Sequence, residues 1–430
     1  MTVEYDFDVI IVGAGLAGSS AALTLAKEGK EVAIIERGQY PGAKNVSGGA
    51  LYGPVLNKIV PNYWEEDAIE RYLTTKKITL LSEKRAMTID IDLQDFAEPP
   101  YNGVTVIRPK FDRWLAQKAE EAGAFILDNT VAEDFIWKDN QIIGIESGED
   151  ELKAKLTIIA EGAVTLLAEK AKLAKKPSPS HYAVGMKETY ELKKEIIEER
   201  FHLNGNEGIS NEFLGYTHGI PGGGFFYTNK ETLSFGLILN MKKLIQKKIR
   251  AIDAFEDFKK HPYIQKLLKD AKMVEYSAHA IPEGGYKHMP KLYGNGVMIA
   301  GDAAGMVLNA GLYIEGMNFA LESGRLAGLA AKEALTTNDY SAEGTKIYLK
   351  LLRDSFVLQD LKRFKRAAKF LERERIFNVY PELLNSLMYQ LLHNTGEPRK
   401  RIVPTAIKHF LKKGKLFKLM GDAFAALRSI

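Results

Sequence analysis

The chain has 430 residues, a net charge of +4 and ordinary proportions of hydrophobic (46%) and charged (27%) residues, so its length predicts two or three sub-domains of a globular protein. It contains no cysteine, which excludes disulfide bonds, thiol catalysis and iron–sulfur clusters held by thiolates of this chain. The sequence has no run of 18 apolar residues, so we expect no transmembrane helix, and the first strand starts too early to leave room for a signal peptide.

The first informative motif joins the opening strand to the helix that follows it. Residues 9–12 form an apolar run, which is typical of a central parallel strand buried on both faces. Gly13 permits a tight turn, Gly15 lets the backbone approach a pyrophosphate, and Gly18 lets the helix pack closely on the strand. Glu36, at the end of the next apolar run, is placed to bind ribose hydroxyls. Glycine turns also occur for steric reasons alone, but strand, helix and acid together predict dinucleotide binding.

The next segment mixes loops, strands and one helix. A glycine-rich loop spans 41–49, and a helix is expected to begin near Pro54. Residues 79–107 alternate apolar and polar side chains, which predicts antiparallel strands. A helix from Arg108 to about Gly123 comes next, and three further strands are expected at 124–127, 131–137 and 142–145. Another buried strand, from residue 156, then ends in an acid and a glycine, Glu161 and Gly162.

The second half of the chain predicts a second sheet and then helices. Residues 175–180 are rich in Pro and Ser, which favours a crossing between domains. Alternating stretches within 181–290 predict a second sheet, with a helix at 251–270. A helix rich in Ala and Gly is expected from about Ile314 to Leu335, and the pattern from Ser341 onward is helical almost to the end.

A buried strand at 296–302 delivers Asp302 to the tight turn Gly301-Asp302-Ala303-Ala304-Gly305. The carboxylate of Asp302 is placed there to bind a ribityl hydroxyl of FAD. The alternative is an aspartate that caps a helix. The N-terminal motif favours the flavin interpretation, because the two motifs together describe both ends of one cofactor.

Four segments resemble a narrower family, namely 44–49, 108–115, 222–229 and the Gly301-Asp302 turn. They are similar to the flavoprotein of electron-transfer-flavoprotein:quinone oxidoreductases (ETF-QO), and most of all to FixC-type subunits, also called EtfC. The resemblance extends from Asp8 to about Gly328. It implies an α/β fold with a glutathione-reductase-type FAD-binding Rossmann domain, a mixed-sheet substrate domain and a helical C-terminal region.

The resemblance also implies which residues contact FAD. They are Gly13, Gly15, Ala17, Gly18, Glu36, Arg37, Lys44, Asn45, Gly48, Gly49, Arg108, Glu161, Gly162, Gly301, Asp302, Gly311, Gly316 and Met317. The first glycines and Glu36 would hold the ADP half, the loop at 44–49 would line the isoalloxazine ring, and Arg108 would approach the pyrophosphate. Backbone N–H groups near Gly316 would stabilise negative charge on the reduced ring. Relatives commonly carry Asp-Gly where this chain has Glu161-Gly162, so a contact at that position stays open.

The expected domain organisation is discontinuous. We expect an FAD-binding domain of residues 1–78, 105–175 and 291–335, a quinone or substrate domain of 79–104 and 176–290, and a helical C-terminal region of 336–430.

Electrons are expected to arrive from another protein, because residues 100–200 show no second dinucleotide motif for a nicotinamide. No catalytic triad is recognisable and no metal site is expected. The glycines and aromatic residues around residue 222 suggest a slot for a quinone ring, and the alternative is a glycine-rich turn before a core strand. The candidate quinone-site residues are Tyr216, His218, Gly223, Gly224, Phe226 and Tyr227.

The C-terminal segment is basic and amphipathic. From Arg399 onward it holds nine Lys or Arg and one acid, Asp422. Apolar residues that fall near one helical face are Ile407, Phe410, Leu411, Phe417, Met420, Phe424 and Leu427. Such a segment suits a lipid interface or a partner protein, and the alternative is packing on its own domain. Nucleic acid is not expected as a partner, since the basic run lacks a reader module.

These features lead to one functional hypothesis and two alternatives. The resemblance implies an FAD-bearing subunit that passes electrons from an electron-transfer flavoprotein to a membrane quinone, within a FixABCX/EtfABCX-like bifurcating complex. The implied partners are electron-transfer flavoprotein α/β-like subunits, a small ferredoxin-like iron–sulfur subunit, menaquinone or ubiquinone, and the membrane surface. The implied location is the cytoplasm, peripheral at the inner face of the cell membrane. The alternatives are a geranylgeranyl-lipid reductase and a non-catalytic flavin-bearing scaffold.

Overall fold

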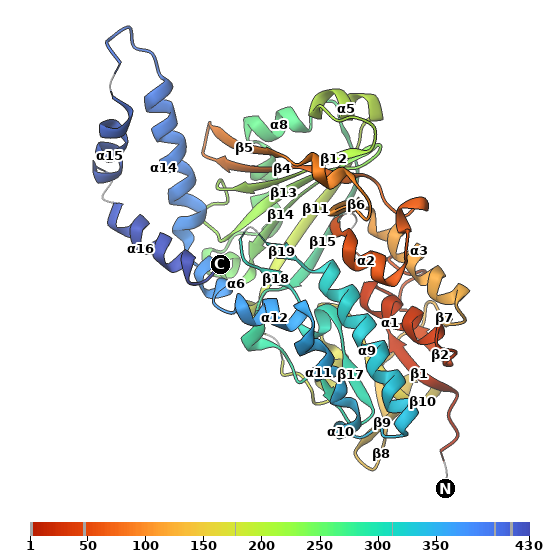
Figure 1. Ribbon diagram of the computed structural model, residues 1–430. Coiled ribbons are helices and arrows are strands. Elements are labelled where there is room, and N and C mark those ends of the chain that lie inside the picture. Colours follow the sequence, from red (N-terminus) through yellow and green to blue (C-terminus); the bar gives the residue numbers. More distant parts are fainter. Residues whose placement is uncertain (1–2, 46–48, 177, 312, 400, 413–415) are drawn as a thin grey trace.

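The structure is a computed structural model that describes residues 3–45, 49–176, 178–311, 313–399, 401–412 and 416–430. Figure 1 shows two sheets with helices packed around them and a helical segment that stands out from the body near the C-terminus. Among the described residues, no helix is both long and apolar enough to cross a bilayer.

The first sheet is built around the strand that the sequence predicts at 9–12. Val9 pairs with Val32 on one side and with Leu156 on the other, both in parallel, and Val9, Ile10 and Ile11 are completely buried. Parallel strands covered on both faces need such continuous aliphatic runs. The sheet follows the order β16-β17-β10-β1-β2-β7, with β9 and β8 added antiparallel beside β10. Its strands are β1 (Phe7–Val12), β2 (Val32–Ile35), β7 (Phe125–Leu127), β8 (Asp134–Lys138), β9 (Gln141–Ser147), β10 (Asp150–Ile159), β16 (Tyr293–Gly294) and β17 (Val297–Ile299).

Helices cover this sheet and share one large apolar core with it. Helix α1 packs on β1 and β2 and touches both α3 and α9. The helices of this part are α1 (Leu16–Ala26), α2 (Gly53–Ile59), α3 (Arg108–Glu121), α4 (Leu166–Lys170), α9 (Met317–Thr337), α10 (Ala342–Thr345), α11 (Ile347–Asp354) and α12 (Phe356–Arg363). The helix expected from Ile314 begins at Met317 instead, because Ile314–Glu315 pairs as strand β19 with β18 (Leu308–Asn309).

The second sheet has nine strands in the path β15-β11-β14-β13-β12-β4-β6-β3, with β5 beside β4. All neighbours are antiparallel except β12 and β4. The strands are β3 (Gly49–Tyr52), β4 (Tyr72–Leu81), β5 (Ala86–Asp92), β6 (Gly103–Val106), β11 (Tyr182–Glu191), β12 (Glu207–Leu214), β13 (Gly222–Thr228), β14 (Thr232–Asn240) and β15 (Lys272–Pro282). The domain boundary that the sequence suggests at residue 78 falls within β4, which runs unbroken from 72 to 81.

One face of the second sheet carries a separate aromatic core. The rings of Phe213, Phe235 and Phe258 pack against one another there. The helices nearby are α5 (Lys194–Phe201), α6 (Met241–Lys247), α7 (Ala251–Lys259) and α8 (Pro262–Leu267). The single helix expected at 251–270 is therefore two helices. Pro262 cannot continue α7, and the His261 side chain caps α8 by accepting from the Tyr263 N–H at 3.2 Å.

The C-terminal helices are α13 (Ala367–Leu371), α14 (Glu374–Leu392), α15 (Ile402–Lys412) and α16 (Leu416–Leu427). In Figure 1, α14 and α15 lie side by side and form the projecting segment. Helix α14 contacts β4, and the Asn385 side chain, past the middle of the helix, donates to the Leu80 carbonyl at 2.9 Å. Asp422 of α16 accepts from Arg373 and Arg375, so the last helix returns to the start of α14.

Candidate functional site

A cavity of about 670 Å³ lies between the two sheets. On one side, it is lined by the carboxyl ends of parallel strands, at Val12, Ile35 and Ala160. On the other side, it is lined by one face of the second sheet, including Ile238 and Ile281. Ligands of open α/β sheets bind at the carboxyl ends of the strands, so the cavity lies where the sequence predicts a dinucleotide.

The turn between β1 and α1 leaves room for a ligand at the helix N-terminus. Gly15 is the first flanking residue of α1, no side chain caps the helix there, and its first turn holds no acidic residue. A Cβ atom on Gly15 would have no neighbour closer than Asn45 Nδ2 at 4.0 Å. The positive end of α1 and its first N–H groups thus face an open space, as phosphate binding requires.

Gly18 has a different role from Gly15. A Cβ atom there would lie 1.8 Å from the Gly13 carbonyl oxygen. Gly18 does not line the cavity, so its function is to let α1 lie against β1. Gly301 behaves in the same way, because its Cβ would lie 2.9 Å from Ala17 Cβ.

Glu36 is held at the cavity wall by backbone hydrogen bonds. One carboxylate oxygen accepts from the Ala14 N–H at 2.9 Å, and the other accepts from the Gly38 N–H at 2.6 Å. The side chain is buried yet lines the cavity. This geometry keeps a carboxylate at the end of β2, where an adenosine ribose would lie.

An ion pair with the buried Asp112 fixes Arg108 in the cavity wall. Its Nε and Nη2 donate to the two oxygens of Asp112 at 2.7 and 2.8 Å, and Asn45 donates to the same carboxylate. Asp112 is fully buried, so the fork of Arg108 supplies its main counter-charge. Burial raises the pKa of the cavity residue Asp302, and the Arg108 guanidinium opposes that shift.

The Glu161 side chain caps a short helix that the sequence analysis does not predict. Its two oxygens accept from the backbone N–H groups of Leu167 and Ala168, at 2.9 and 2.8 Å, at the start of α4. Burial raises its pKa, and these hydrogen bonds lower it. The residue lines the cavity, but its carboxylate already has two partners.

Most of the predicted cofactor residues gather around this cavity. Those that line it are Gly13, Gly15, Ala17, Glu36, Arg37, Lys44, Asn45, Gly49, Arg108, Glu161, Gly162, Asp302, Gly316 and Met317. Gly18, Gly301 and Gly311 are not among the lining residues. Gly48 lies outside the described residues.

The structure separates the candidate quinone residues. Side chains alternate along β13, so Phe225 and Tyr227 face the cavity. Gly224 and Phe226 face the aromatic core instead, and Phe226 is fully buried there beside Phe201. Gly223 lies on the cavity side by the same alternation, although it is not among the lining residues.

The other two candidates lie in the loop after β12, away from the cavity. The His218 ring nitrogen is 3.3 Å from a carboxylate oxygen of Asp257 in α7. The Tyr216 ring packs 5.0 Å from the ring of His261. Of the six candidates, Tyr227 is the one that lines the cavity, and burial raises its pKa strongly.

Sequence reasoning missed several polar or aromatic residues of the cavity wall, and those of the second sheet include Lys187, Phe225 and His279. They come from β11, β13 and β15, whose order in the sheet does not follow the order in the chain. Lys187 stands among buried neighbours on β11, but that burial is known only from the folded chain, so no local pattern in the sequence marks the residue.

The cavity residues fit FAD, as judged from the uncapped helix start at Gly15, the space there and the carboxylates at both ends of the cavity. Three family models match the chain in agreement with this. They are an FAD binding domain over residues 8–72, an ETF-QO ubiquinone-binding domain over 182–281 and the ETF-QO/FixC family C-terminal domain over 367–430.

The chain is also similar to curated proteins over nearly its whole length. It is 42% identical to Protein FixC of Escherichia coli K12 over 409 residues, covering 95% of each chain. It is 37% identical to the probable electron transfer flavoprotein-quinone oxidoreductase YdiS of the same strain over 417 residues, covering 97% of each. Protein FixC of Bradyrhizobium diazoefficiens is 37% identical over 437 residues, covering 99% of each.

Among solved structures, a geranylgeranyl bacteriochlorophyll reductase-like protein of Thermoplasma acidophilum matches with a TM-score of 0.72 and 21% identity, covering 97% of this chain and 98% of that one. The flavin-dependent brominase Bmp2 matches with a TM-score of 0.64 and 19% identity, covering 89% of each chain. At these identities the likeness establishes the fold alone. The predicted fold class and the prediction of FAD are confirmed.

Proposed function

The chain belongs to the ETF-QO/FixC family of FAD-dependent oxidoreductases, and we propose that it passes electrons from an electron-transfer flavoprotein to a membrane quinone. The observation that carries the proposal is that the segment matched by the ubiquinone-binding family model lines the cavity. Residues 182–281 form β11 to β15 with their helices, and all of these strands except β12 contribute residues that line the cavity. Acceptor and cofactor would therefore share one enclosed space.

Bound FAD would supply the one- and two-electron chemistry, and the chain would position it. Glu36 and the start of α1 would hold its adenosine and pyrophosphate parts. Arg108 offers a fixed cation within the wall. Phe225 and Ile281 give the cavity apolar surface on the side of the second sheet, which keeps water away from an acceptor ring.

The test is reoxidation of the protein's flavin without oxygen. We expect a reduced electron-transfer flavoprotein to bleach the flavin absorbance of the purified protein, and a short-chain ubiquinone or menaquinone analogue to restore it. NADH added directly is expected to leave the flavin oxidised. Flavin that reoxidises only with dioxygen, or that is reoxidised by a geranylgeranyl lipid but not by quinone, would contradict the proposal.

The finer part of the proposal is a FixABCX/EtfABCX-like bifurcating complex with electron-transfer flavoprotein α/β-like subunits and a small iron–sulfur subunit. Two facts support it. The relatives named FixC match over nearly the full chain, and the chain has no cysteine, so any thiolate-bound cluster must come from a partner. Purification from the native cell at low salt is expected to bring these partners along, identified by mass spectrometry. Recovery of this chain without any of these partners would contradict the proposed complex.

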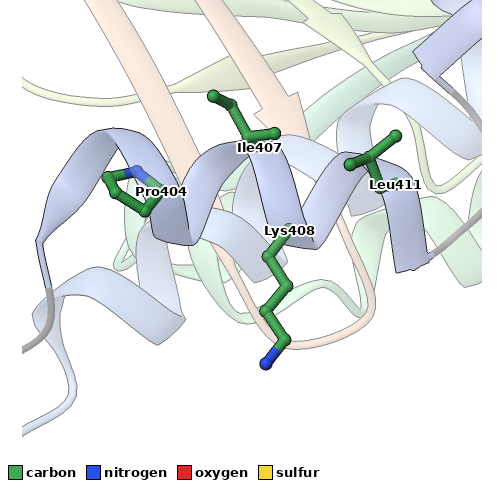
Figure 2. A pocket seen from close by; sticks show the side chains of 4 residues that line it. All are labelled: Pro404, Ile407, Lys408 and Leu411. Carbon is green, nitrogen blue, oxygen red and sulfur yellow. The ribbon is translucent and has the colours of Figure 1, made fainter.

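The exposed apolar residues of α15 and α16 support contact with the membrane at the inner face. On α15 they are Ile402, Val403, Ile407 and Leu411, and on α16 they are Met420, Phe424 and Leu427. Pro404, Ile407, Lys408 and Leu411 line one shallow groove on α15. In Figure 2, the ammonium end of Lys408 extends away from the side of the helix that carries Ile407 and Leu411. Exposed apolar side chains flanked by cations suit a helix that lies in the interface of an anionic bilayer.

Replacing Ile407 and Leu411 together by glutamate is expected to lower binding to anionic vesicles by about tenfold or more, since each lost side chain contributes about 1 kcal/mol of burial. The measurement is co-sedimentation with phosphatidylglycerol-containing vesicles at two salt concentrations, with weaker binding at the higher one. The matched control replaces Ile245 and Met273, two exposed apolar residues outside this segment, by glutamate. Equal loss of binding in both double variants would show that α15 is not the membrane contact.

A further inference from the structure

One buried cation of the cavity wall has no role in the account above. Lys187 lies on β11, the second strand from one edge of the second sheet. The strand register places it in one row with Phe225 of β13, Gly236 of β14 and Ser277 of β15. The next row on the cavity side ends in His279 of β15. Phe225 covers the open position of Gly236, where a Cβ would lie 2.2 Å from its ring. Lys187 therefore lies beside an aromatic ring on the wall that faces the cofactor.

The ammonium of Lys187 is buried and has no hydrogen-bond partner in the part of the chain that the structure describes. The residue is 1% exposed, and among the described residues its Nζ atom finds no hydrogen-bond acceptor. Two lysines of β4 in the same sheet are paired, Lys76 with Glu212 and Lys77 with Asp90. A buried unpaired ammonium costs several kcal/mol, so a chain that keeps one in a ligand cavity has a partner for it in the loaded state.

We infer that Lys187 is the cationic contact for a ring carbonyl oxygen that enters this cavity and gains negative charge when electrons arrive. Two sources offer that chemistry, the isoalloxazine ring of the bound flavin and the dione of the acceptor quinone. The inference rests on the proposed function, because it assigns a residue to that reaction. The Lys187 ammonium would donate a hydrogen bond to that oxygen and place a positive charge next to it. Phe225, beside Lys187, would pack on the ring.

The surroundings of Lys187 make its charge respond to pH. Burial lowers the pKa of Lys187 to about 7, with Glu275 of β15 opposing the shift and Arg108 of α3 adding to it. β14 and β13 face it with Gly236 and Phe225, which do not titrate. His279 of β15 lies in the next row, and burial lowers its own pKa.

Negative charge on the neighbouring ring oxygen raises the pKa of Lys187. Lys187 therefore has one pKa beside the oxidised ring and a higher one beside the reduced ring. At pH values between the two, the amine takes up one proton from solvent for each two electrons that reach the ring. This adds a tenfold change in the reduction equilibrium per pH unit, about 30 mV for a two-electron couple.

The experiment compares Lys187→Met and Lys187→Arg in the FAD-loaded full chain. The flavin midpoint potential is measured from pH 6 to pH 9 without quinone, and quinone KM is measured separately. Lys187→Met is expected to disfavour reduction by at least tenfold at pH 6 and to lose the extra pH dependence. Lys187→Arg keeps the cation and is expected to match the potential of the unmodified protein at pH 6, while losing the extra pH dependence. The matched control is Lys155→Met, whose ammonium pairs with Asp8 outside the cavity.

The two sources give different results. A shifted potential in quinone-free protein assigns the flavin carbonyl, whereas an unchanged potential with a quinone KM raised at least tenfold assigns the quinone oxygen. Unchanged potential, pH dependence and KM in both Lys187 variants would overturn the inference. Failure of the proposed function looks different, because the unmodified protein would then not be reoxidised by quinone at all. Folding is checked on the FAD-free protein, where Lys187→Met is expected to be at least as stable as the unmodified chain.

Discussion

A Gly15→Ala variant is expected to bind FAD about 10- to 100-fold more weakly while its FAD-free form unfolds at an unchanged temperature. The new methyl group would enter the space at the start of α1 that the pyrophosphate needs, and overpacking of a tight site costs about 1–3 kcal/mol. The fold has no reason to change, since the nearest atom would be Asn45 Nδ2 at 4.0 Å. Fluorescence titration with FAD and calorimetry of the FAD-free protein measure the two quantities.

The matched variant is Gly18→Ala, three residues along the same helix. Its Cβ would lie 1.8 Å from a backbone oxygen, so α1 must move away from β1, and we expect a loss of stability of about 3 kcal/mol or more along with the loss of FAD. Gly15→Ala that retained full FAD affinity would show that the cofactor does not lie on this turn. Gly18→Ala with normal stability would contradict the close packing seen here.

An Arg108→Met variant is expected to lose about 3–5 kcal/mol of stability, because it leaves Asp112 as a buried carboxylate without its counter-charge. Among the described residues, the Asn45 side chain would remain as the one side-chain partner of that carboxylate. FAD binding is expected to weaken as well, since Arg108 lines the cavity. Denaturant unfolding of the FAD-free protein reports the first effect, and FAD titration reports the second.

The double variant Arg108→Met with Asp112→Asn separates these two effects. A neutral amide in place of the carboxylate removes the uncompensated charge, so most of the stability is expected to return, while FAD affinity stays low. Recovery of both properties would mean that Arg108 acts only through Asp112. Recovery of neither would mean that its apolar contacts, and not its charge, hold the wall together.

The adenosine end of the site could be predicted from sequence because its parts are local. Strand β1, the glycine turn and α1 are consecutive, and Glu36 follows at the end of the adjacent strand β2. Their spacing alone dictates that these groups meet. The Asp302 turn was predictable by its motif, although only the folded chain places it beside Arg108.

The acceptor side could not be predicted in this way. A glycine-rich stretch at 222–224 indicated a slot, yet the side of the sheet that each residue faces depends on the register of β13 with β12 and β14. That register turns Tyr227 toward the cavity and Phe226 toward the aromatic core. Tyr216 and His218, only a few residues earlier, lie in a loop beside α7.

The amino-acid sequence by itself thus determined the FAD-binding βαβ unit, the fold class and the basic, amphipathic C-terminal helices, since each depends on contacts or periodicity within a short stretch of chain. The tertiary structure alone decided which side chains of the second sheet form the cavity wall. Strands β11, β13, β14 and β15 come together by hydrogen-bond register between distant segments, and a shift of one residue in that register would have turned Lys187 away from the cofactor.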